Sequence, residues 1–170
     1  MIRFDLQSAA VLGVALSLSC VTAVVVRRLD DGGQAHAATL EAVQPRASGT
    51  AAQVVRGPDG HYWAQARIDG RAVEVLVDTG ATVVALTRED ALRLGVDPAP
   101  AAFTREVRTA SGVARAAPVR LASVSVAGTR VDAVEALVVE EGLSYSLLGM
   151  SYLGRLSGFE ATPHGLTLRP

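Results

Sequence analysis

Strand-like segments separated by turn residues dominate this chain from residue 61 to its carboxyl end. Short runs of apolar and β-branched residues alternate there with glycine, proline and aspartate. β-Branched residues favour pleated strands, and the residues between such runs are typical of tight turns. The pattern therefore predicts an all-β domain built mainly from antiparallel strands.

Residues 62–77 carry the clearest hairpin signal. Two strand-like runs, residues 62–68 and 72–77, flank Asp69 and Gly70. This dipeptide readily adopts the positive φ angles of a two-residue turn, so the sequence predicts a β-hairpin. Further strands are expected at residues 82–86, 103–109, 113–126, 131–139, 146–148 and 166–169, with Gly112, Gly128, Gly142 and Gly165 as turn markers.

One short helix is predicted at residues 88–94. Thr87 can cap its first turn, and Glu89 and Asp90 complement the positive end of its dipole. Gly95 can end the helix in the left-handed conformation. The helix thus has two turns or so and follows directly on a strand.

The amino-terminal segment has the composition of a membrane helix. Residues 6–26 contain no charged side chain and are almost entirely apolar from residue 9 onward. A helix that spans a bilayer needs about 20 such residues, whereas the core of a secretory signal has about 7–15. We therefore predict a membrane anchor in residues 1–28, a flexible linker in residues 29–52 and a folded domain in residues 53–170.

Two other interpretations of this segment stay open. Residues 35–37 (Ala-His-Ala) match the small-x-small pattern of a signal-peptidase site, which would release a secreted domain. A lipidated Cys20 fits less well, because the residues before it do not suit such a signal and apolar sequence continues past it. The charges that flank the segment do not decide its orientation.

Charge and ligand-forming residues exclude several classes of function. The 170 residues carry a formal net charge of -1, which gives no basic surface for nucleic acid. The single cysteine excludes an intrachain disulfide and a cysteine-based zinc cluster, and the three histidines are scattered along the chain. We therefore expect no nucleic-acid partner, no metal site and no cofactor.

An acidic residue at the end of an apolar strand is the strongest chemical signal. Residues 73–77 (VEVLV) lead directly into Asp78, Thr79, Gly80 and Ala81. Asp-Thr-Gly by itself is also a common turn sequence. In this context it resembles the retropepsin-like aspartic proteases, in which the catalytic aspartate follows an apolar strand within Asp-Thr-Gly-Ala or Asp-Ser-Gly-Ala.

The resemblance extends over residues 53–170. The predicted hairpin precedes the motif and the predicted helix follows it. A turn at residues 110–112 and the late residues 147–150 (Leu-Leu-Gly-Met) also come in the family's order. The resemblance implies an acid-protease half-barrel with one or two short helices, the second at residues 150–156. It looks like the membrane-anchored, single-domain bacterial members, which implies a periplasmic domain on a single-pass inner-membrane anchor.

The resemblance also implies a role for each matching residue. Asp78 would transfer the proton, Thr79 would hydrogen-bond to its counterpart in a second copy, and Gly80 lets backbone amides approach the carboxylate. A glycine at position 149 would let a strand pass close behind this loop. The implied site residues are Asp78, Thr79, Gly80 and Ala81 in the active-site loop, Ala110, Ser111 and Gly112 in a flap over the substrate, and Leu147, Leu148 and Gly149 in the strand behind the loop. An ordinary glycine turn is the alternative for the flap.

The single Asp-Thr-Gly of the chain has a consequence for assembly. Peptide hydrolysis by carboxylates needs two groups in different protonation states, one to activate water and one to hydrogen-bond the carbonyl oxygen. The second group would be Asp78 of another copy, related by a two-fold axis. Two like charges about 3 Å apart do not both ionise easily, so the pair would share one proton. By resemblance, residues 53–56 and 166–169 would form the dimer sheet.

The sequence thus predicts a homodimeric aspartic endopeptidase that cleaves extended polypeptides and is tethered to a membrane by its amino-terminal helix. The alternative function is a non-catalytic, dimeric module of the same fold that binds peptides. The intact Asp-Thr-Gly favours the enzyme, because peptide binding alone does not require a catalytic carboxylate.

Overall fold

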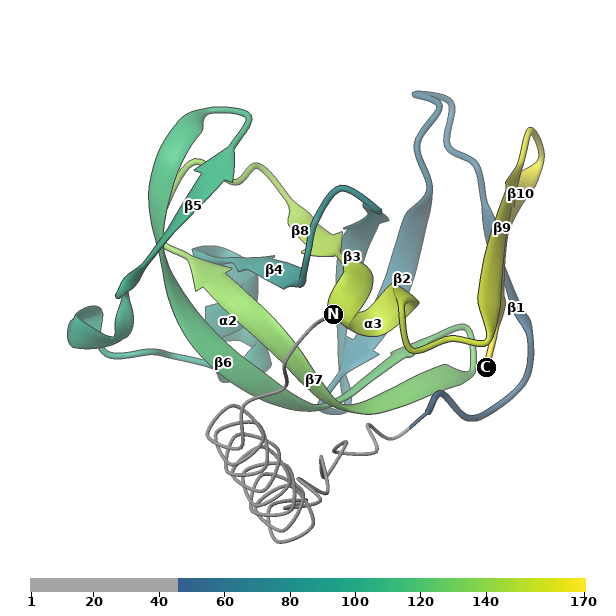
Figure 1. The fold of residues 1–170 in the computed structure, drawn as a ribbon, viewed down its shortest axis with the longest axis horizontal. Coiled ribbons are helices and arrows are strands. Elements are labelled where there is room, and N and C mark those ends of the chain that lie inside the picture. Colours follow the sequence, from purple (N-terminus) through teal and green to yellow (C-terminus); the bar gives the residue numbers. More distant parts are fainter. Residues whose placement is uncertain (1–45) are drawn as a thin grey trace, which may run out of the picture. The chain divides into compact units, whose positions relative to one another are not determined.

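Ten strands and three short helices make up the part of the chain that the structure, a computed structural model, describes: residues 46–170 (Figure 1). The strands are β1 (Ala52–Val55), β2 (Trp63–Ile68), β3 (Arg71–Val77), β4 (Val84–Thr87), β5 (Arg105–Thr109), β6 (Gly112–Val126), β7 (Thr129–Val139), β8 (Ser146–Leu148), β9 (Gly158–Thr162) and β10 (Gly165–Arg169). The helices are α2 (Arg88–Leu94), the 3₁₀ helix η1 (Pro100–Ala102) and α3 (Met150–Leu153). The predicted all-β class is confirmed.

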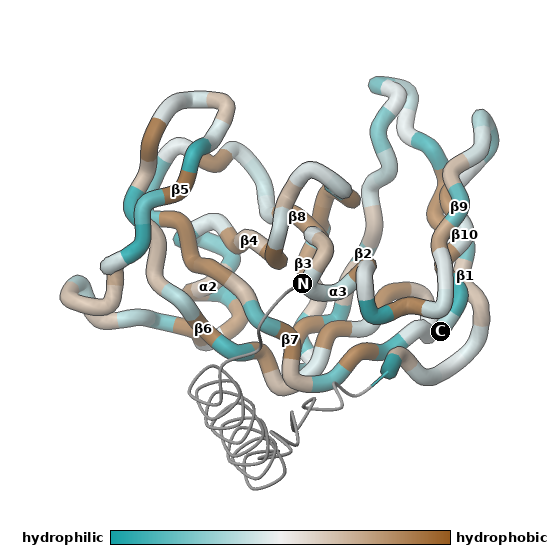
Figure 2. Tube along the Cα trace, in the orientation of Figure 1, coloured by the Kyte–Doolittle hydropathy of each residue, from teal (hydrophilic) through white to brown (hydrophobic). Residues whose placement is uncertain are grey.

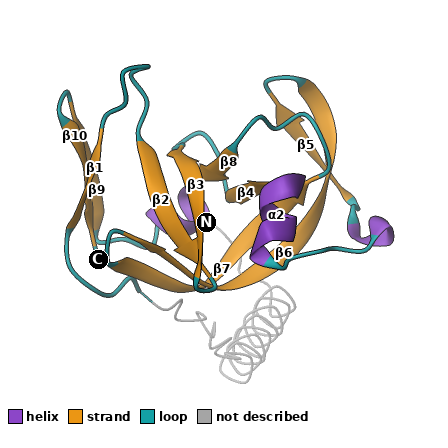
Figure 3. Ribbon diagram, turned by 180° about the vertical axis from the view of Figure 1, so that it is seen from behind, coloured by secondary structure: helices purple, strands orange, loops and turns teal. Residues whose placement is uncertain are grey.

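The strands form two sheets. A three-stranded antiparallel sheet has the order β1-β10-β9, and the larger sheet has the order β2-β3-β8-β4-β7-β6-β5. Strand β2 pairs with β6 as well as with β3, so the larger sheet closes on itself and only β5 stands outside the ring. Helix α2 packs against β3, β4 and β7 (Figure 3).

The larger sheet has an interlocked connection at its centre. Strand β8 runs parallel to β3 and lies between β3 and β4, and β4 in turn runs parallel to β7. Because β3 and β4 are consecutive in the chain, the segment that joins them, residues 78–83, must cross the end of β8. This crossing brings the Asp-Thr-Gly motif against the strand that the sequence places near the carboxyl end.

The predicted hairpin and the predicted first helix are both confirmed. Strands β2 and β3 are paired along their length, and Ile68 opposite Arg71 is the last pair before the turn. The two turn residues, Asp69 and Gly70, have φ angles of 49° and 85°. Helix α2 has the predicted bounds. The Asp90 backbone amide donates to the Thr87 hydroxyl over 3.0 Å, and Gly95 ends the helix with φ of 79°.

The buried apolar side chains form two clusters, and the larger cluster includes residues from both sheets. Strand β2 alternates buried and exposed residues, as a strand with one face on a core must. Figure 2 shows apolar and polar residues alternating along the long strands β6 and β7. Ile68, Leu86, Leu121, Leu148 and Tyr152 are among the largest fully buried side chains of the larger cluster.

Three local features differ from the sequence-based expectations. Strand β9 was not predicted, because its sequence (GFEAT) has no apolar run. The strand forms by pairing with β10. Helix α3 ends at Leu153 rather than at residue 156. Strand β5 starts at Arg105 rather than at residue 103, because Phe103 is buried at the end of η1.

The folded domain also starts earlier than the predicted boundary at residue 53. The Ser48 backbone exchanges hydrogen bonds of 2.8 and 2.7 Å with Arg130, and the Ala47 amide donates to the Arg155 carbonyl. Residues 47–52 therefore belong to the fold rather than to a linker. The predicted anchor at residues 6–26 and most of the linker lie outside the described residues. Among the residues that are described, no helix has the length and apolar character needed to cross a membrane.

Candidate active site

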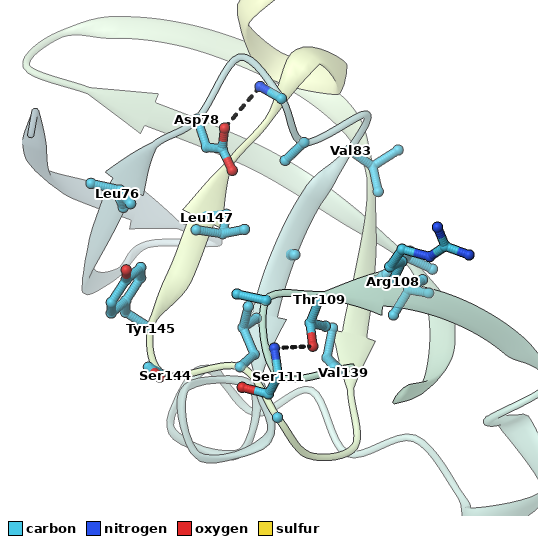
Figure 4. Close-up of a pocket in the computed structure, with 18 of the residues that line it drawn as sticks. Leu76, Asp78, Val83, Arg108, Thr109, Ser111, Val139, Ser144, Tyr145 and Leu147 are labelled. Carbon is cyan, nitrogen blue, oxygen red and sulfur yellow. Dashed lines mark hydrogen bonds between the residues drawn. The ribbon is translucent and has the colours of Figure 1, made fainter. Parts of the chain in front are cut away.

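The loop after β3 carries Asp78 and is held from behind by the end of β8. The Asp78 amide donates to the Leu148 carbonyl over 3.2 Å, and the Met150 amide donates to the Ala81 carbonyl over 2.8 Å. Within the loop, the Gly80 amide donates to Asp78 Oδ1 over 2.8 Å (Figure 4). These bonds fix both the loop and the half-buried carboxylate that it carries.

Gly149 lies where β8 crosses the loop. A Cβ atom at this position would lie 2.7 Å from the Ala81 carbonyl oxygen, which is closer than real Cβ contacts allow. The structure therefore places Leu147, Leu148 and Gly149 directly behind the loop that carries the Asp-Thr-Gly motif. Leu148 is fully buried, whereas Leu147 faces the groove described next.

An open groove with a volume of about 450 Å³ runs beside Asp78 (Figure 4). Among residues 46–170, Asp78 is the one carboxylate that lines it. The apolar lining comes from strands β3, β4, β5, β7 and β8 and from the β7–β8 loop: Leu76, Ala85, Val107, Leu137, Val139, Leu143 and Leu147. The groove thus combines a largely apolar lining with an acid at its side.

The predicted flap lies across this groove from Asp78. Strands β5 and β6 form a hairpin with Thr109 opposite Gly112, so Ala110 and Ser111 are its two turn residues. The Thr109 hydroxyl accepts from the Ser111 amide over 3.2 Å and donates to the Gly112 carbonyl over 3.0 Å. Ala110 and Ser111 line the groove, and Gly112, with φ of 123°, closes the turn.

Thr79 and Asp78 face a second hollow on the other side of the loop. Its volume is about 280 Å³, and its wall includes Phe159, Ala161 and Leu166 of the smaller sheet. Thr79 is exposed, and its hydroxyl has no hydrogen-bond partner among residues 46–170. The predicted bond from Thr79 to its counterpart would need a second copy of the chain.

An aromatic wall of the groove was not predicted. Tyr145, in the β7–β8 loop, lines the groove and is 42% exposed. Its ring contacts Trp63, the first residue of β2. A large aromatic residue between Gly142 and the short strand β8 was the available signal, but only the fold brings it into the groove that Asp78 also lines.

Titratable groups with shifted pKa values lie outside the lining of the groove among the described residues. Burial raises the pKa of Tyr152, whose hydroxyl donates to the Thr129 carbonyl over 2.9 Å. Burial likewise lowers the pKa of Arg155, and the charge of Asp132 partly opposes this. Hydrogen bonds from the Trp63 indole and the His61 amide lower the pKa of Asp59.

Comparisons with known proteins agree with this geometry. Residues 64–155 match a family model described as "gag-polyprotein putative aspartyl protease". The crystal structure of a retropepsin-like aspartic protease from Rickettsia conorii superposes with a TM-score of 0.64 and 37% sequence identity. The matched region covers 71% of this chain and 100% of that one.

Two uncharacterised bacterial proteins are also similar. A Sinorhizobium protein is 43% identical over 112 residues, which are 65% of this chain and 48% of the relative. A protein of Rickettsia prowazekii is 42% identical over 106 residues, which are 62% of this chain and 46% of the relative. The chain thus spans about half the length of these curated relatives. From the family model, the fold and the loop that carries Asp78, we conclude that the chain belongs to the retropepsin-like aspartic proteases.

Proposed function

We propose that this chain is an aspartic endopeptidase whose catalytic pair consists of Asp78 from two copies. The observation that carries this proposal is the position of Asp78. In the described part of the chain it is the one carboxylate that lines the open groove, and its loop is fixed by the end of β8. A single carboxylate can act as an acid or as a base, but peptide hydrolysis needs both at once. The groove of one chain therefore holds half of the required chemistry.

In the proposed reaction, the ionised Asp78 takes a proton from a water molecule, whose oxygen attacks the peptide carbonyl carbon. The protonated Asp78 of the partner subunit gives its proton to the carbonyl oxygen. The tetrahedral gem-diol intermediate then collapses. Asp78, protonated by the water, gives its proton to the amine nitrogen as the C–N bond breaks, and the partner's Asp78 takes a proton from one of the two hydroxyl groups, which becomes the carbonyl of the new carboxyl group, so the pair again holds one proton. The Gly80 backbone amide keeps the first carboxylate in place by donating a hydrogen bond to Oδ1.

Two features support an assembly of two copies. The exposed Thr79 lies beside the hollow lined by Phe159 and Leu166, which a second copy would cover. Val55, on strand β1 at the edge of the smaller sheet, is 74% exposed. An unpaired edge of this kind is a template for pairing with another chain.

We also propose the substrate and the location that the sequence suggested. An extended polypeptide would lie in the groove under the β5–β6 hairpin, bound largely through its backbone. A membrane anchor at residues 6–26, with the domain in the periplasm, would raise the local concentration of two protomers and favour a weak dimer.

The test compares wild-type protein with Asp78→Asn, a variant that keeps the shape of the side chain and its bond to Gly80. With unfolded casein as substrate, we expect cleavage by the wild type to be inhibited by a statine-type transition-state mimic. The variant should lose activity by about 10²–10⁴-fold or more, with unchanged folding and dimerisation. Cleavage that survives in Asp78→Asn would reject the catalytic role. A dimeric wild type that binds peptides without cleaving them would establish the non-catalytic module instead.

A mixing experiment tests whether two copies share the site. A tenfold excess of Asp78→Asn is added to a fixed amount of wild type, at concentrations where sedimentation shows dimers. Random exchange should then reduce activity to about one-eleventh, because most wild-type chains would be paired with an inactive copy. Activity that stays constant would show that one chain carries the complete site.

A further inference from the structure

Tyr145 is the aromatic wall of the groove at the end near Leu76 and Leu147 (Figure 4). It belongs to the loop between β7 and β8, and no hydrogen bond to another described residue holds its hydroxyl group. A half-exposed side chain on such a loop would be free to change rotamer unless another group fixed it. The position of this wall therefore depends on what packs behind it.

Trp63 is the group behind the wall. The two ring centroids lie 5.0 Å apart with an interplanar angle of 78°, an edge-to-face contact. Trp63 lines a second, polar hollow next to the groove. Tyr145 lines both, together with Val139, Leu143 and Ser144, so the tyrosine is part of the wall between them. Trp63 itself does not line the groove beside Asp78.

Trp63 is in turn fixed from its other side by Asp59. The indole Nε1–H donates to Asp59 Oδ2 over 2.8 Å, and Asp59 Oδ1 accepts from the His61 amide over 3.0 Å. His61 Nδ1 also lies 3.3 Å from Asp59 Oδ2. The loop before β2 thus orients the indole, and the indole orients the tyrosine ring.

We propose that Trp63 is a positioning residue for substrate selection. It holds Tyr145 against the groove, and the pocket that Tyr145, Leu76 and Leu147 form then favours a large apolar substrate side chain beside the scissile bond. Trp63 acts without touching the substrate. This inference rests on the proposed function, because it concerns which peptides the groove accepts.

The first test uses fluorescence and needs no catalysis. Trp63 is the single tryptophan of the chain, so its emission reports on this contact alone. In the full-length dimer, Tyr145→Ala should shift the emission to the red and increase quenching by acrylamide, because water then reaches the indole. Tyr145→Phe, which keeps the ring, should leave both unchanged. Val83→Ala, at the other side of the groove in Figure 4, is the matched control and should also leave them unchanged.

The second test measures selectivity with two peptides that differ only in having leucine or alanine beside the scissile bond. For the wild type we expect the leucine peptide to be preferred. Trp63→Ala should reduce this preference by roughly two- to tenfold, the range of an aromatic pair, mainly through a higher KM for the leucine peptide. Trp63→Phe should restore it. In the double variant Trp63→Ala/Tyr145→Ala, the preference should fall no further than in Tyr145→Ala, because Trp63 acts only through Tyr145.

The outcomes separate this inference from the proposed function. Unchanged Trp63 emission in Tyr145→Ala overturns the inference even if casein is cleaved. An equal loss of kcat/KM for both peptides in Trp63→Ala and Trp63→Phe overturns it as well, since that result indicates general destabilisation. A chain that shows the expected emission changes but cleaves no peptide contradicts the proposed function, and the preference is then measured as peptide binding affinity.

Discussion

Gly149 and Val83 are in direct backbone contact: a Cβ atom on Gly149 would lie 2.2 Å from the Val83 carbonyl oxygen and 2.6 Å from its carbonyl carbon. Both neighbouring atoms are backbone and cannot move by rotation of a side chain. The end of β8 and the loop that carries Asp78 can therefore lie together only because residue 149 has no side chain.

Gly149→Ala should destabilise the domain by about 3 kcal/mol or more, because the new methyl group must displace either β8 or residues 81–83. Chemical denaturation measures this loss, and cleavage should fall even in the fraction that stays folded. Gly158→Ala is the matched control, since a Cβ atom there meets nothing within 4 Å. Equal stability of the two variants would contradict the close contact.

Ser146→Ala should cost about 1–3 kcal/mol of stability, because the buried Asp90 carboxylate and the part-buried Thr87 amide lose their partner. The fully buried Ser146 hydroxyl donates to Asp90 Oδ2 over 2.5 Å and accepts from the Thr87 amide over 3.1 Å. Thermal and urea unfolding check the value. Ser144→Ala, two residues earlier and exposed, should be nearly neutral, and a similar loss there would argue against the buried bonds as the cause.

Gly112→Ala and Gly70→Ala should both lower stability by about 1–2 kcal/mol, because both residues have positive φ angles with open space around them. Only Gly112→Ala should also reduce cleavage of casein, since the β5–β6 hairpin lines the groove and the β2–β3 turn does not. Parallel unfolding and activity measurements separate the two effects. Equal activity of the variants would remove the hairpin from the proposed substrate site.

Acidification should change the emission of Trp63 with a midpoint below pH 3.8, the ordinary value for aspartate. The hydrogen bond from the Trp63 indole is the largest cause of the lowered pKa of Asp59, and the hydrogen bond from the His61 amide is the next. The folded state therefore holds the ionised form of Asp59 more strongly than the unfolded state does. The corresponding stability is present above pH 3.8 and is lost as the pH falls through the lower, folded-state pKa. Asp59→Asn should abolish this transition, with circular dichroism as the check on folding. A midpoint above 3.8 would contradict the assignment.

Local sequence patterns determined much of the fold. Asp69-Gly70 specified the β2–β3 turn because few other dipeptides adopt two successive positive φ angles, and Thr87 and Gly95 set the ends of α2 because they satisfy helix-terminal backbone groups. These signals depend on neighbouring residues only. The motif at Asp78 was recognisable for the same reason, since strand, acid, hydroxyl and glycine are contiguous in the chain.

Other features depended on residues far apart in the sequence, and the sequence alone did not determine them. Strand β9 has almost no buried apolar face and exists because β10 offers it hydrogen bonds. By sequence Tyr145 is an ordinary loop residue. The crossing of β8 between β3 and β4 brings it into the groove that Asp78 lines and against Trp63, which lies 82 positions earlier. The sequence by itself thus determined the elements and the acidic residue, whose signals are local. The tertiary structure alone decided which side chains line the groove around that acid, because their contacts arise only when distant strands pair.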